Sequence, residues 1–349
     1  MKKLKIAQLA PLWIPVPPRT YGGIELMLSL LTEELVKNGH DVTLFASGDS
    51  VTKARLVAPT QKAILLQKKL RSPHAKIVNM LHMVKKEAAS FDIIHNHFGF
   101  FMFPLALNGD MPPILTTIHR PADDDSAAAM KLFPQMRFCA ISEDAKRDVE
   151  EKGIPVADVV YNGIDPDLYS FNDKPENYLL YLGRLNWEKG IVPALRVAKM
   201  AGKKIVVAGN LIGGEEWNYF MQEVQPHLNE EGVNFVGQAD FKTKVNLLKN
   251  AEALLFPIDR REPFGLIMIE AMACGTPVIA YRRGSVPEVV EHGKTGFAVD
   301  TEEEMIMAIN EIPSLNRREC RKAVEEKFTL KLMIERYENL YRKILNGAV

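Results

Sequence analysis

The segment REPFGLIMIEAMACGTPVIA, residues Arg261–Ala280, places a turn, a helix and a strand in direct succession. Its Pro-Phe-Gly sequence at residues 263–265 indicates a turn, and the apolar run Leu266–Cys274 predicts a helix that ends at Gly275. The apolar, β-branched stretch that follows, residues 276–281, indicates a buried strand. A helix that leads directly into a buried strand is typical of α/β proteins with parallel sheets.

Two glutamates flank this turn and helix. Glu262 precedes the turn, and Glu270 lies about 9 Å along the helix axis at ~1.5 Å per residue. Gly265 allows a ligand to approach the backbone closely, and the N–H groups of the first helical turn favour phosphate. Carboxylates at two depths suit a ligand that has hydroxyl groups at both ends and phosphates between them. A helix with charged flanks and no ligand is the alternative interpretation.

Strand-like runs alternate with helical patterns before this segment. The predicted strands of the first half are residues 5–10, 41–46, 92–97, 113–119 and 137–142. The predicted helices between them lie near residues 25–38, 73–90 and 143–152, and Ser142 is the expected N-cap of the last one. Residues 161–178 are rich in Asn and Asp and contain prolines and a glycine, which is typical of a linker.

The alternation restarts after the linker. The predicted strands there are residues 178–183, 204–209, 233–237, 253–257, 276–281 and 296–300. Three polar-faced helical segments close the chain at residues 302–312, 316–327 and 330–345. We therefore expect an α/β protein with two facing Rossmann-like domains, residues 1–165 and 166–330, each with a parallel sheet. Ligands bind such sheets at the carboxyl ends of the strands, so we expect the active site in the cleft between the domains.

The composition indicates a globular protein of about two domains. The chain has 349 residues, of which 47% are hydrophobic and 25% are charged. Lys and Arg together number 44, as do Asp and Glu, and this balance argues against nucleic acid as a partner. The three cysteines are scattered without metal-ligand spacing, which fits a cytoplasmic protein. The N-terminal sequence MKKLKIAQLAP indicates a first strand rather than a signal peptide, and no apolar run is long enough to span a membrane.

Two adjacent glycines, Gly22 and Gly23, precede a predicted helix in the sequence RTYGGIELMLSLLTEEL, residues 19–35. Glycine is a poor helix former, so the pair needs a physical explanation. One interpretation is a tight turn with a weak N-cap. The other is that an anion approaches the backbone at the helix N-terminus, where free N–H groups and the helix dipole favour negative charge.

Several nucleotide-binding and metal-binding signatures are absent or incomplete. No G-x-G-x-x-G sequence follows the first strand, which argues against nicotinamide or flavin dehydrogenases. The GKT sequence at Gly293–Thr295 lacks the earlier glycine of a Walker A loop, because Glu288 stands there, and we interpret it as a turn. The acidic run Asp123–Asp125 is similar to the acidic motif of metal-dependent sugar transferases, but its position favours an exposed loop or a helix N-cap.

The chain resembles the family-4 (group 1) retaining glycosyltransferases of the GT-B fold over essentially its whole length. In chain order, the motifs that carry the resemblance are YGGIE, DIIHNHF, TTIHR, VVYNGIDPDLY, YLGRLNWEKG, EPFGLIMIE and GSVPEVVEHGKTGFAVD. The resemblance implies a C-terminal helix, residues 331–349, that returns to the first domain. It also implies transfer of a hexose from a nucleotide-diphosphate sugar to a hydroxyl acceptor.

The resemblance implies a donor site in the second domain. Arg184 and Lys189 match the family's basic pair on the nucleotide diphosphate, and Glu270 matches the residue that holds the ribose hydroxyls. Glu262 matches the catalytic residue that contacts the transferred sugar. The backbone that supports the sugar and the phosphates matches Phe264, Gly265 and Leu266.

The resemblance also implies contributions from the first domain. Gly22 and Gly23 match a glycine loop that lies over the diphosphate, and His119 matches the catalytic histidine that faces the sugar. Tyr21 and His97 are candidates for the acceptor side.

His95 and His97 share one face of a predicted strand, which would allow metal binding. No third ligand is evident in the sequence, so we favour a structural or an acceptor-side role. The family generally needs no metal, because Arg184, Lys189 and two helix N-termini can neutralise the leaving diphosphate. We therefore expect no metal and no cofactor, with the nucleotide sugar as co-substrate.

Members of this family retain the configuration of the anomeric carbon. A double displacement would need a nucleophile and an acid/base about 5 Å apart. No motif supplies a clear nucleophile, so the resemblance favours front-side displacement. The expected donor is UDP-glucose or a related UDP-sugar, and GDP-mannose is the alternative.

Two rival functions remain open. A nucleotide-sugar epimerase would use the same fold, but the EPFGLIMIE and GRLNWEKG motifs argue against it. A non-catalytic nucleotide-sugar-binding protein could lack His119 or Glu262, and both are present.

The acceptor is expected to be a hydroxyl of a sugar, a lipid-linked or a small molecule. The loops expected to choose it are residues 10–21, 47–55 and 121–134. The segment Gln61–Ser90 carries seven basic residues and one acidic residue, Glu87. Such a segment can dock peripherally on the anionic inner face of a membrane, and a solvated face is the alternative.

Overall fold

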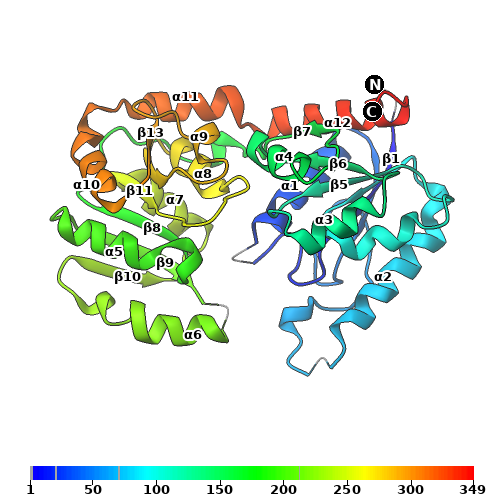
Figure 1. Ribbon diagram of the computed structural model, residues 1–349, viewed down its shortest axis with the longest axis horizontal. Helices are drawn as coiled ribbons and strands as arrows, with labels where there is room; N and C mark the ends of the chain where they lie inside the picture. The colour runs from blue at the N-terminus through cyan, green and yellow to red at the C-terminus, as the bar shows by residue number, and fades with distance from the viewer. Residues whose placement is uncertain (1–2, 20–21, 70, 212) are drawn as a thin grey trace. The chain divides into compact units, whose positions relative to one another are not determined.

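The computed structural model describes residues 3–19, 22–69, 71–211 and 213–349. Its internal contacts form two compact units. Unit 1 is Met1–Gly163 together with Leu330–Val349, and unit 2 is Ile164–Thr329. Each unit is built on its own parallel sheet, with helices on both faces (Figure 1).

In the described part of unit 1, seven strands form a parallel sheet in the order β3-β2-β1-β4-β5-β6-β7. The order reverses between β1 and β4, so the topological switch of this sheet lies at their carboxyl ends. Gln8 is opposite His95 in the register of these two strands. The strands are β1 Lys5–Leu9, β2 Asp41–Phe45, β3 Arg55–Val57, β4 Ile93–Asn96, β5 Ile114–Ile118, β6 Arg137–Ala140 and β7 Asp158–Val159.

Helices cover both faces of the unit 1 sheet, because alternate residues of a buried strand point to opposite faces. On one face, α1 and α12 pack over a cluster that includes Ile6, Leu31 and Tyr337. On the other face, α2 packs over a cluster that includes Leu9 and Met80. The α-helices of unit 1 are α1 Gly23–Lys37, α2 Pro73–Glu87, α3 Asp124–Lys131, α4 Glu143–Glu150 and α12 Leu330–Leu345.

Among the described residues of unit 2, six strands form a parallel sheet in the order β10-β9-β8-β11-β12-β13. This order reverses between β8 and β11. The strands are β8 Leu179–Arg184, β9 Ile205–Asn210, β10 Val233–Gly237, β11 Ala253–Phe256, β12 Val278–Tyr281 and β13 Gly296–Val299. The α-helices are α5 Ile191–Met200, α6 Glu215–Tyr219, α7 Phe241–Asn250, α8 Leu266–Ala273, α9 Val286–Val289, α10 Glu302–Glu311 and α11 Arg317–Lys327.

Every strand that the sequence pattern predicts is present. The additional strands β3 and β7 have three and two residues, which is too short for a hydrophobic periodicity. Ser142 caps α4 as predicted, since its hydroxyl accepts from the Ala145 N–H at 3.0 Å. Gly275 follows the end of α8 with a φ of 86°.

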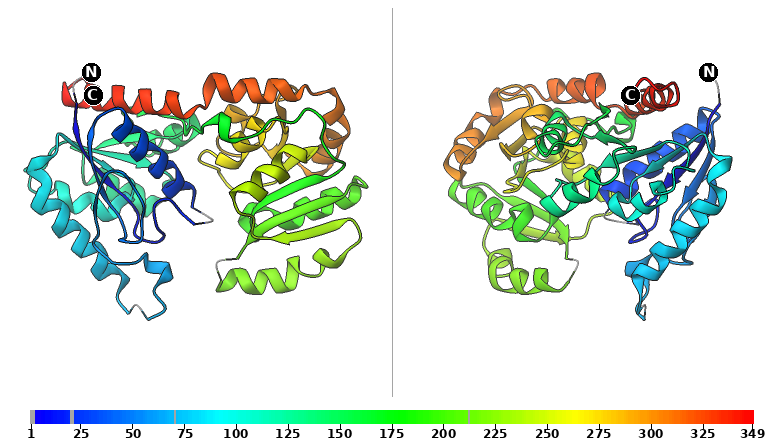
Figure 2. Two further views of the ribbon diagram at one scale, coloured as in Figure 1. Left: turned by 180° about the vertical axis from the view of Figure 1, so that it is seen from behind. Right: turned by 45° about the vertical axis from the view of Figure 1, so that its right-hand side comes forward.

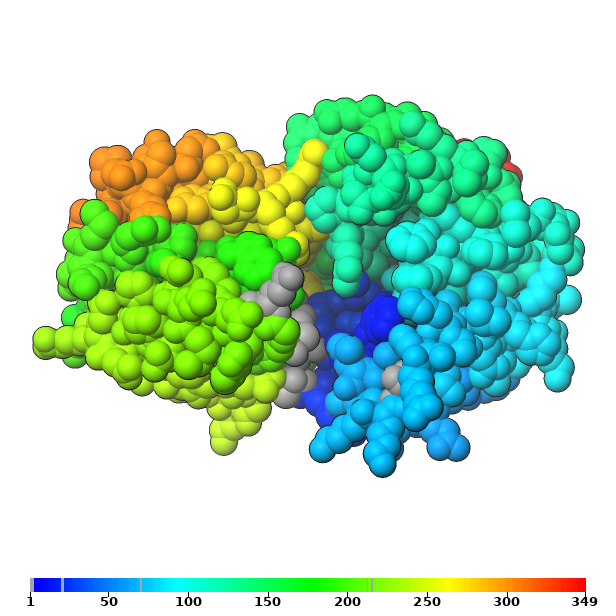
Figure 3. Space-filling view, turned by 60° about the horizontal axis from the view of Figure 1, so that its bottom comes forward, coloured from blue at the N-terminus to red at the C-terminus, as the bar shows by residue number. Residues whose placement is uncertain are grey.

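A protruding segment precedes α2 in unit 1. It contains the short 3₁₀ helix η1, Ile64–Leu66, and Figure 2 shows it projecting at one end of α2. The space-filling view shows its light-blue atoms standing out from the surface of unit 1 (Figure 3). In the described part of the chain, we find no helix with the length and apolarity needed to span a bilayer.

Candidate active site

The carboxyl end of β8 positions both predicted diphosphate ligands, Arg184 and Lys189. Arg184 is the last residue of β8, and Lys189 ends a short 3₁₀ turn. Asn186 caps this turn, because its Oδ1 accepts the Lys189 backbone N–H at 3.1 Å. Gly190 has a φ of 70°, and a Cβ there would lie 1.9 Å from the Pro257 carbonyl oxygen, so only glycine fits. The turn therefore brings two cations to the topological switch of unit 2.

Carboxylates hold both cations in place. The Arg184 guanidinium lies 3.1 Å from a Glu188 oxygen and 3.0 Å from a Glu216 oxygen. Lys189 Nζ donates to Glu262 Oε2 at 2.9 Å. The Arg184 and Lys189 side chains are only 17% and 16% exposed, so these charge-assisted bonds are partly shielded from water. Arg184 and Lys189 thus lie on one turn, and Lys189 contacts the predicted catalytic Glu262 directly.

The backbone of the turn before α8 is fixed by close packing. The Glu262 carbonyl accepts from the Ser285 N–H at 2.9 Å, and a Cβ at Gly284 would lie 2.3 Å from that carbonyl oxygen. Gly265 has a φ of 76°, and a Cβ there would lie 2.6 Å from Met268 Cε. Glycine is therefore required at position 265, in this turn, and at position 284, which packs against it.

Phe264 and Leu266 flank Gly265 at the start of α8. The Phe264 side chain is buried and packs edge to face on Phe328, with ring centroids 5.8 Å apart. Its ring is therefore in the core, and only the backbone of this turn is placed to meet a ligand. The N–H groups of the first turn of α8 and the helix dipole favour an anion there.

Glu270 lies on the buried side of α8, with 4% of the residue exposed. Its Oε1 accepts from the Tyr169 hydroxyl at 2.8 Å and from Lys244 Nζ at 2.5 Å. Burial and the Glu270 charge raise the pKa of Tyr169, so its hydroxyl remains a donor. Neither partner is among the site residues predicted from the sequence. Tyr169 belongs to the VVYNGIDPDLY motif, whereas no sequence motif marks Lys244.

The carboxyl ends of β1, β4 and β5 bring Gln8, His97 and His119 together in unit 1. His119 follows β5, and its Nε2 lies 3.0 Å from His97 Nδ1. His97 Nε2 lies 2.9 Å from Gln8 Oε1. Burial lowers the pKa of His97 well below its usual value, and burial together with the Arg120 charge lowers the pKa of His119 to about 3. Both imidazoles are therefore neutral at pH 7.

His97, one of the two acceptor-side candidates, is buried. This residue is only 3% exposed, and its two ring nitrogens are bonded to Gln8 and His119. These contacts favour the structural role of His97, and its acceptor-side role stays a prediction. Tyr21, the other acceptor-side candidate, lies outside the described residues.

His95 and His97 lie side by side, with ring centroids 3.9 Å apart, as expected for one strand face. His95 Nδ1 lies 2.7 Å from the Tyr341 hydroxyl, and its Nε2 lies 2.7 Å from Thr117 Oγ1. Both histidines therefore use their ring nitrogens for hydrogen bonds inside the protein. In the ranges that the structure describes, no group of three or more His, Cys, Asp or Glu side chains is placed to hold a metal ion.

The two glycines of the YGGIE motif differ in their surroundings. Gly22 has a φ of 152°, and a Cβ there would lie 2.4 Å from Ile14 Cδ1 and 2.9 Å from Glu25 Oε2. Gly23 is exposed, begins α1 and has no positive φ. Conformation and packing explain the glycine at position 22 but not the one at position 23. Glu25 is buried below Gly22, and burial raises its pKa to about 7.

Two other sequence motifs have the structural roles that we predicted for them. Asp123 is the N-cap of α3, and its Oδ1 accepts from the Ser126 N–H at 2.6 Å. The GKT sequence, Gly293–Thr295, forms a turn in which Thr295 Oγ1 accepts from the Glu291 N–H at 2.9 Å.

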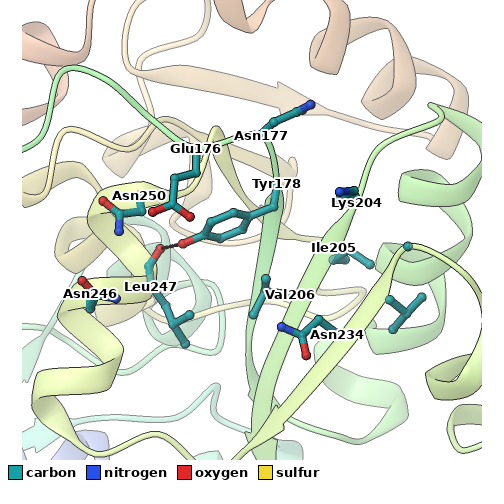
Figure 4. Close-up of a pocket in the computed structure, with 12 residues that line it drawn as sticks. Glu176, Asn177, Tyr178, Lys204, Ile205, Val206, Asn234, Asn246, Leu247 and Asn250 are labelled. Atoms are coloured by element: carbon teal, nitrogen blue, oxygen red, sulfur yellow. Dashed lines mark hydrogen bonds between the residues drawn. The ribbon is translucent and has the colours of Figure 1, made fainter.

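A pocket of about 570 Å³ lies at the amino ends of β8, β9 and β10 (Figure 4). Its lining includes Tyr178, Lys204 and Asn234, and the Tyr178 hydroxyl donates to the Leu247 carbonyl at 2.9 Å. Arg184 lies at the opposite, carboxyl end of β8. This pocket is therefore separate from the predicted donor site.

Comparison with known proteins gives matches along the whole chain. Residues 21–168 match the model of glycosyltransferase family 4, and residues 170–328 match that of the glycosyl transferases group 1. The N-acetyl-alpha-D-glucosaminyl L-malate synthase of Bacillus anthracis is 25% identical over 94% of this chain and 97% of its own.

Solved structures show the same fold. The sucrose-phosphate synthase of Thermosynechococcus elongatus has a TM-score of 0.83 at 19% identity, covering 99% of this chain and 100% of its own. Anabaena HepE in complex with UDP-glucose has a TM-score of 0.75 at 18% identity, covering 99% and 100%. The chain therefore belongs to the group 1, family 4 glycosyltransferases, and its two parallel-sheet, Rossmann-like units match their GT-B fold.

Proposed function

We propose that this glycosyltransferase moves a hexose from a nucleotide-diphosphate sugar to a hydroxyl acceptor and retains the anomeric configuration. The observation that carries the proposal is the placement of Arg184 and Lys189 on one turn, with Lys189 bonded to Glu262 just before α8. A diphosphate is bound by fixed cations and by backbone N–H groups at a helix N-terminus. A sugar is bound by carboxylates that accept from its hydroxyls. This turn offers all three kinds of group.

Each predicted donor-site side chain of unit 2 then has a defined contact with the nucleotide sugar. Arg184 and Lys189 exchange part of their carboxylate contacts for the diphosphate, and each contributes about 1.5–3 kcal/mol. Glu262 accepts from a hydroxyl of the transferred sugar. Glu270 accepts from the ribose hydroxyls, because a carboxylate has about four acceptor sites and Tyr169 and Lys244 occupy two of them.

Front-side displacement is the mechanism that we propose. The bond from the anomeric carbon to the donor phosphate breaks, and the bond to the acceptor oxygen forms on the same face of the sugar. The acceptor proton passes to an oxygen of the leaving diphosphate. His119 is neutral, because its pKa is lowered to about 3, so it interacts with the sugar as a hydrogen-bonding group and not as a cation.

Fixed cations replace a metal ion in this proposal. Arg184, Lys189 and the N-terminus of α8 neutralise the leaving diphosphate. Turnover is therefore expected to persist in excess EDTA. Complete loss of activity that Mg²⁺ or Mn²⁺ restores would show that the cations are insufficient.

UDP-glucose or a related UDP-sugar is the donor that we propose, and GDP-mannose is the alternative. Support comes from the similarity of the chain to HepE, whose structure contains UDP-glucose. A panel of UDP- and GDP-sugars tests the choice by thermal stabilisation, followed by product analysis with a mixture of hydroxyl acceptors. We expect UDP-glucose to stabilise the protein most and the hexose to appear on an acceptor. A product that is only an isomerised nucleotide sugar would indicate an epimerase instead.

The basic segment Gln61–Ser90, which contains η1 and α2, is a proposed contact with an anionic membrane. Leu65 and Leu66 are 59% and 44% exposed on η1, and Val78 on α2 is 63% exposed. Among the described residues, the same segment carries basic side chains without an ion pair: Lys62, Lys68, Lys69, Arg71, Lys76 and Lys86. Exposed leucines next to clustered cations suit an anionic lipid surface.

A further inference from the structure

A continuous series of hydrogen bonds, buried except at its His119 end, joins the C-terminal helix α12 to His119 within unit 1. The Gln8 Nε2 donates to the Tyr341 hydroxyl at 3.3 Å, and Gln8 Oε1 lies 2.9 Å from His97 Nε2. His97 Nδ1 lies 3.0 Å from His119 Nε2. Gln8, His97 and Tyr341 are all buried, so bulk water does not compete for the bonds that join these three residues.

The donor and acceptor properties of each atom determine the direction of these hydrogen bonds. The amide oxygen of Gln8 only accepts, so His97 carries its proton on Nε2. A neutral imidazole has a single N–H, so His97 Nδ1 is an acceptor and His119 Nε2 is the donor to it. The other ring nitrogen of His119, Nδ1, then has a lone pair. It has no hydrogen-bond partner among the residues that the structure describes, and His119 is partly exposed.

The orientation of the Gln8 amide decides which tautomer His119 adopts. If the amide turned over, its NH₂ group would face His97, and every donor and acceptor up to His119 would exchange roles. The Tyr341 hydroxyl favours the observed orientation. Its oxygen lies 2.7 Å from His95 Nδ1, a distance typical of an O–H donor, so its single proton goes to His95 and its oxygen accepts from Gln8.

We propose that Gln8 and Tyr341 are positioning residues that hold His119 as the Nε2–H tautomer and so present its Nδ1 lone pair as an acceptor. This inference rests on the proposed function, in which His119 faces the sugar. The group that meets Nδ1 is then a hydroxyl of the transferred hexose, which donates a hydrogen bond to the ring. A donor whose sugar lacks that hydroxyl loses the contact.

Tyr337 provides a matched control for Tyr341. Both tyrosines are fully buried on α12, but the Tyr337 hydroxyl bonds to Thr117 Oγ1 at 3.2 Å instead of to Gln8. Replacement by phenylalanine removes one buried hydroxyl from the same helix in either case. Only Tyr341→Phe removes the hydroxyl that accepts the hydrogen bond from the Gln8 amide.

The tautomer of His119 is measurable without substrate, by long-range ¹H–¹⁵N spectra of protein labelled with ¹⁵N-histidine, in which His119→Asn assigns its signals. We expect the Nε2–H form in the wild type and in Tyr337→Phe. In Tyr341→Phe, we expect both tautomers to be populated, because the amide of Gln8 can turn over. We also expect kcat to fall about tenfold while the donor KM stays within about twofold of the wild type.

Several results would overturn the proposal: an Nδ1–H form in the wild type, an unchanged tautomer in Tyr341→Phe, or an equal loss of kcat in Tyr337→Phe. A changed tautomer with an unchanged kcat would refute the role of the tautomer in turnover. Failure of the proposed function is distinguishable from all of these. It would appear as absent nucleotide-sugar turnover in the wild type, whereas the tautomer measurement needs no turnover.

Discussion

A methyl group added at Gly22 would lie 2.4 Å from Ile14 Cδ1, and the φ of 152° disfavours any L-residue there. We therefore expect Gly22→Ala to lower the free energy of unfolding by about 1–3 kcal/mol. Gly23 is exposed at the first position of α1, so Gly23→Val is expected to fold with a melting shift of a few degrees at most. Thermal unfolding of the two variants measures this contrast.

Turnover of Gly23→Val separates the two interpretations of the YGGIE motif. If the first turn of α1 lies against the donor diphosphate, the valine side chain occupies ligand space, and turnover should fall at least ~100-fold, about 2.7 kcal/mol. Donor affinity should fall less, because most of the proposed nucleotide contacts belong to unit 2. A folded Gly23→Val with a near-normal rate would show that the glycines only form a turn.

Glu25, buried below Gly22, makes stability depend on pH. Its pKa in the folded protein is about 7, raised chiefly by burial from 4.5. Between these two values the folded state holds a proton that the unfolded state has released, so this group's contribution to stability falls as pH rises through the window. Glu25→Gln should match the wild type near pH 4.5 and exceed it above pH 7, by at most about 3 kcal/mol. A melting-temperature difference that is constant from pH 4.5 to 8 would contradict this.

Local motifs at the residue scale predict part of the candidate site. Arg184 and Lys189 lie on one turn, so their proximity follows from sequence spacing alone. The link between Gln8 and Tyr341 spans 333 positions and depends on the packing of α12, so no local pattern indicates it. The contact of Lys244 with Glu270 cannot be predicted from local sequence for the same reason, because it depends on the packing of α7 beside α8.

At the scale of elements, the boundaries of helices are predicted correctly where a residue at the boundary itself determines them. The glycines at 265 and 275 bound α8, and both have positive φ angles. Ser142 and Asp123 begin α4 and α3 through side-chain hydrogen bonds to the backbone. The edge strands β3 and β7 were not predicted, because they are defined by pairing with β2 and β6 and not by their own composition.

The basic segment Gln61–Ser90, with η1 and α2, supports a prediction about membranes. Anionic vesicles should sediment the protein at low salt and release it at high salt, because its cations are attracted to the lipid surface and salt screens them. Replacing Leu65 and Leu66 by serine should weaken this binding without changing stability. Leu132→Ser is the matched control, since Leu132 is 75% exposed at the end of α3, outside this segment.

The opposite result in the vesicle experiment is equally informative. If the wild type stays in the supernatant at low ionic strength, the segment is a solvated face and the acceptor is not presented by an anionic membrane. If the variant with serine at positions 65 and 66 binds vesicles as well as the wild type does, the binding is due to charge alone and the exposed leucines do not contribute.

At the scale of the whole molecule, the chain completes unit 1 only with its last residues. It leaves unit 1 at Gly163 and returns at Leu330, so α12 adds Tyr337 and Tyr341 to a core that contains Ile6, Ile93 and Leu115, more than 200 residues earlier. Rossmann-like alternation predicts two sheets but does not specify this addition, which the family resemblance supplied.

The most direct test of the account is the affinity of the protein for a nucleotide sugar, measured by isothermal titration with UDP-glucose and GDP-mannose. Lys189→Ala and Arg184→Ala should each weaken the Kd of the preferred donor by about 10- to 100-fold, equivalent to ~1.4–2.8 kcal/mol. Lys199→Ala is the matched control, since Lys199 lies on α5, pairs with Glu230 at 2.7 Å and is 69% exposed. We expect an unchanged Kd for this control and unchanged melting temperatures for Arg184→Ala and Lys199→Ala. Wild-type affinity in both Lys189→Ala and Arg184→Ala would contradict a donor site at the carboxyl end of β8.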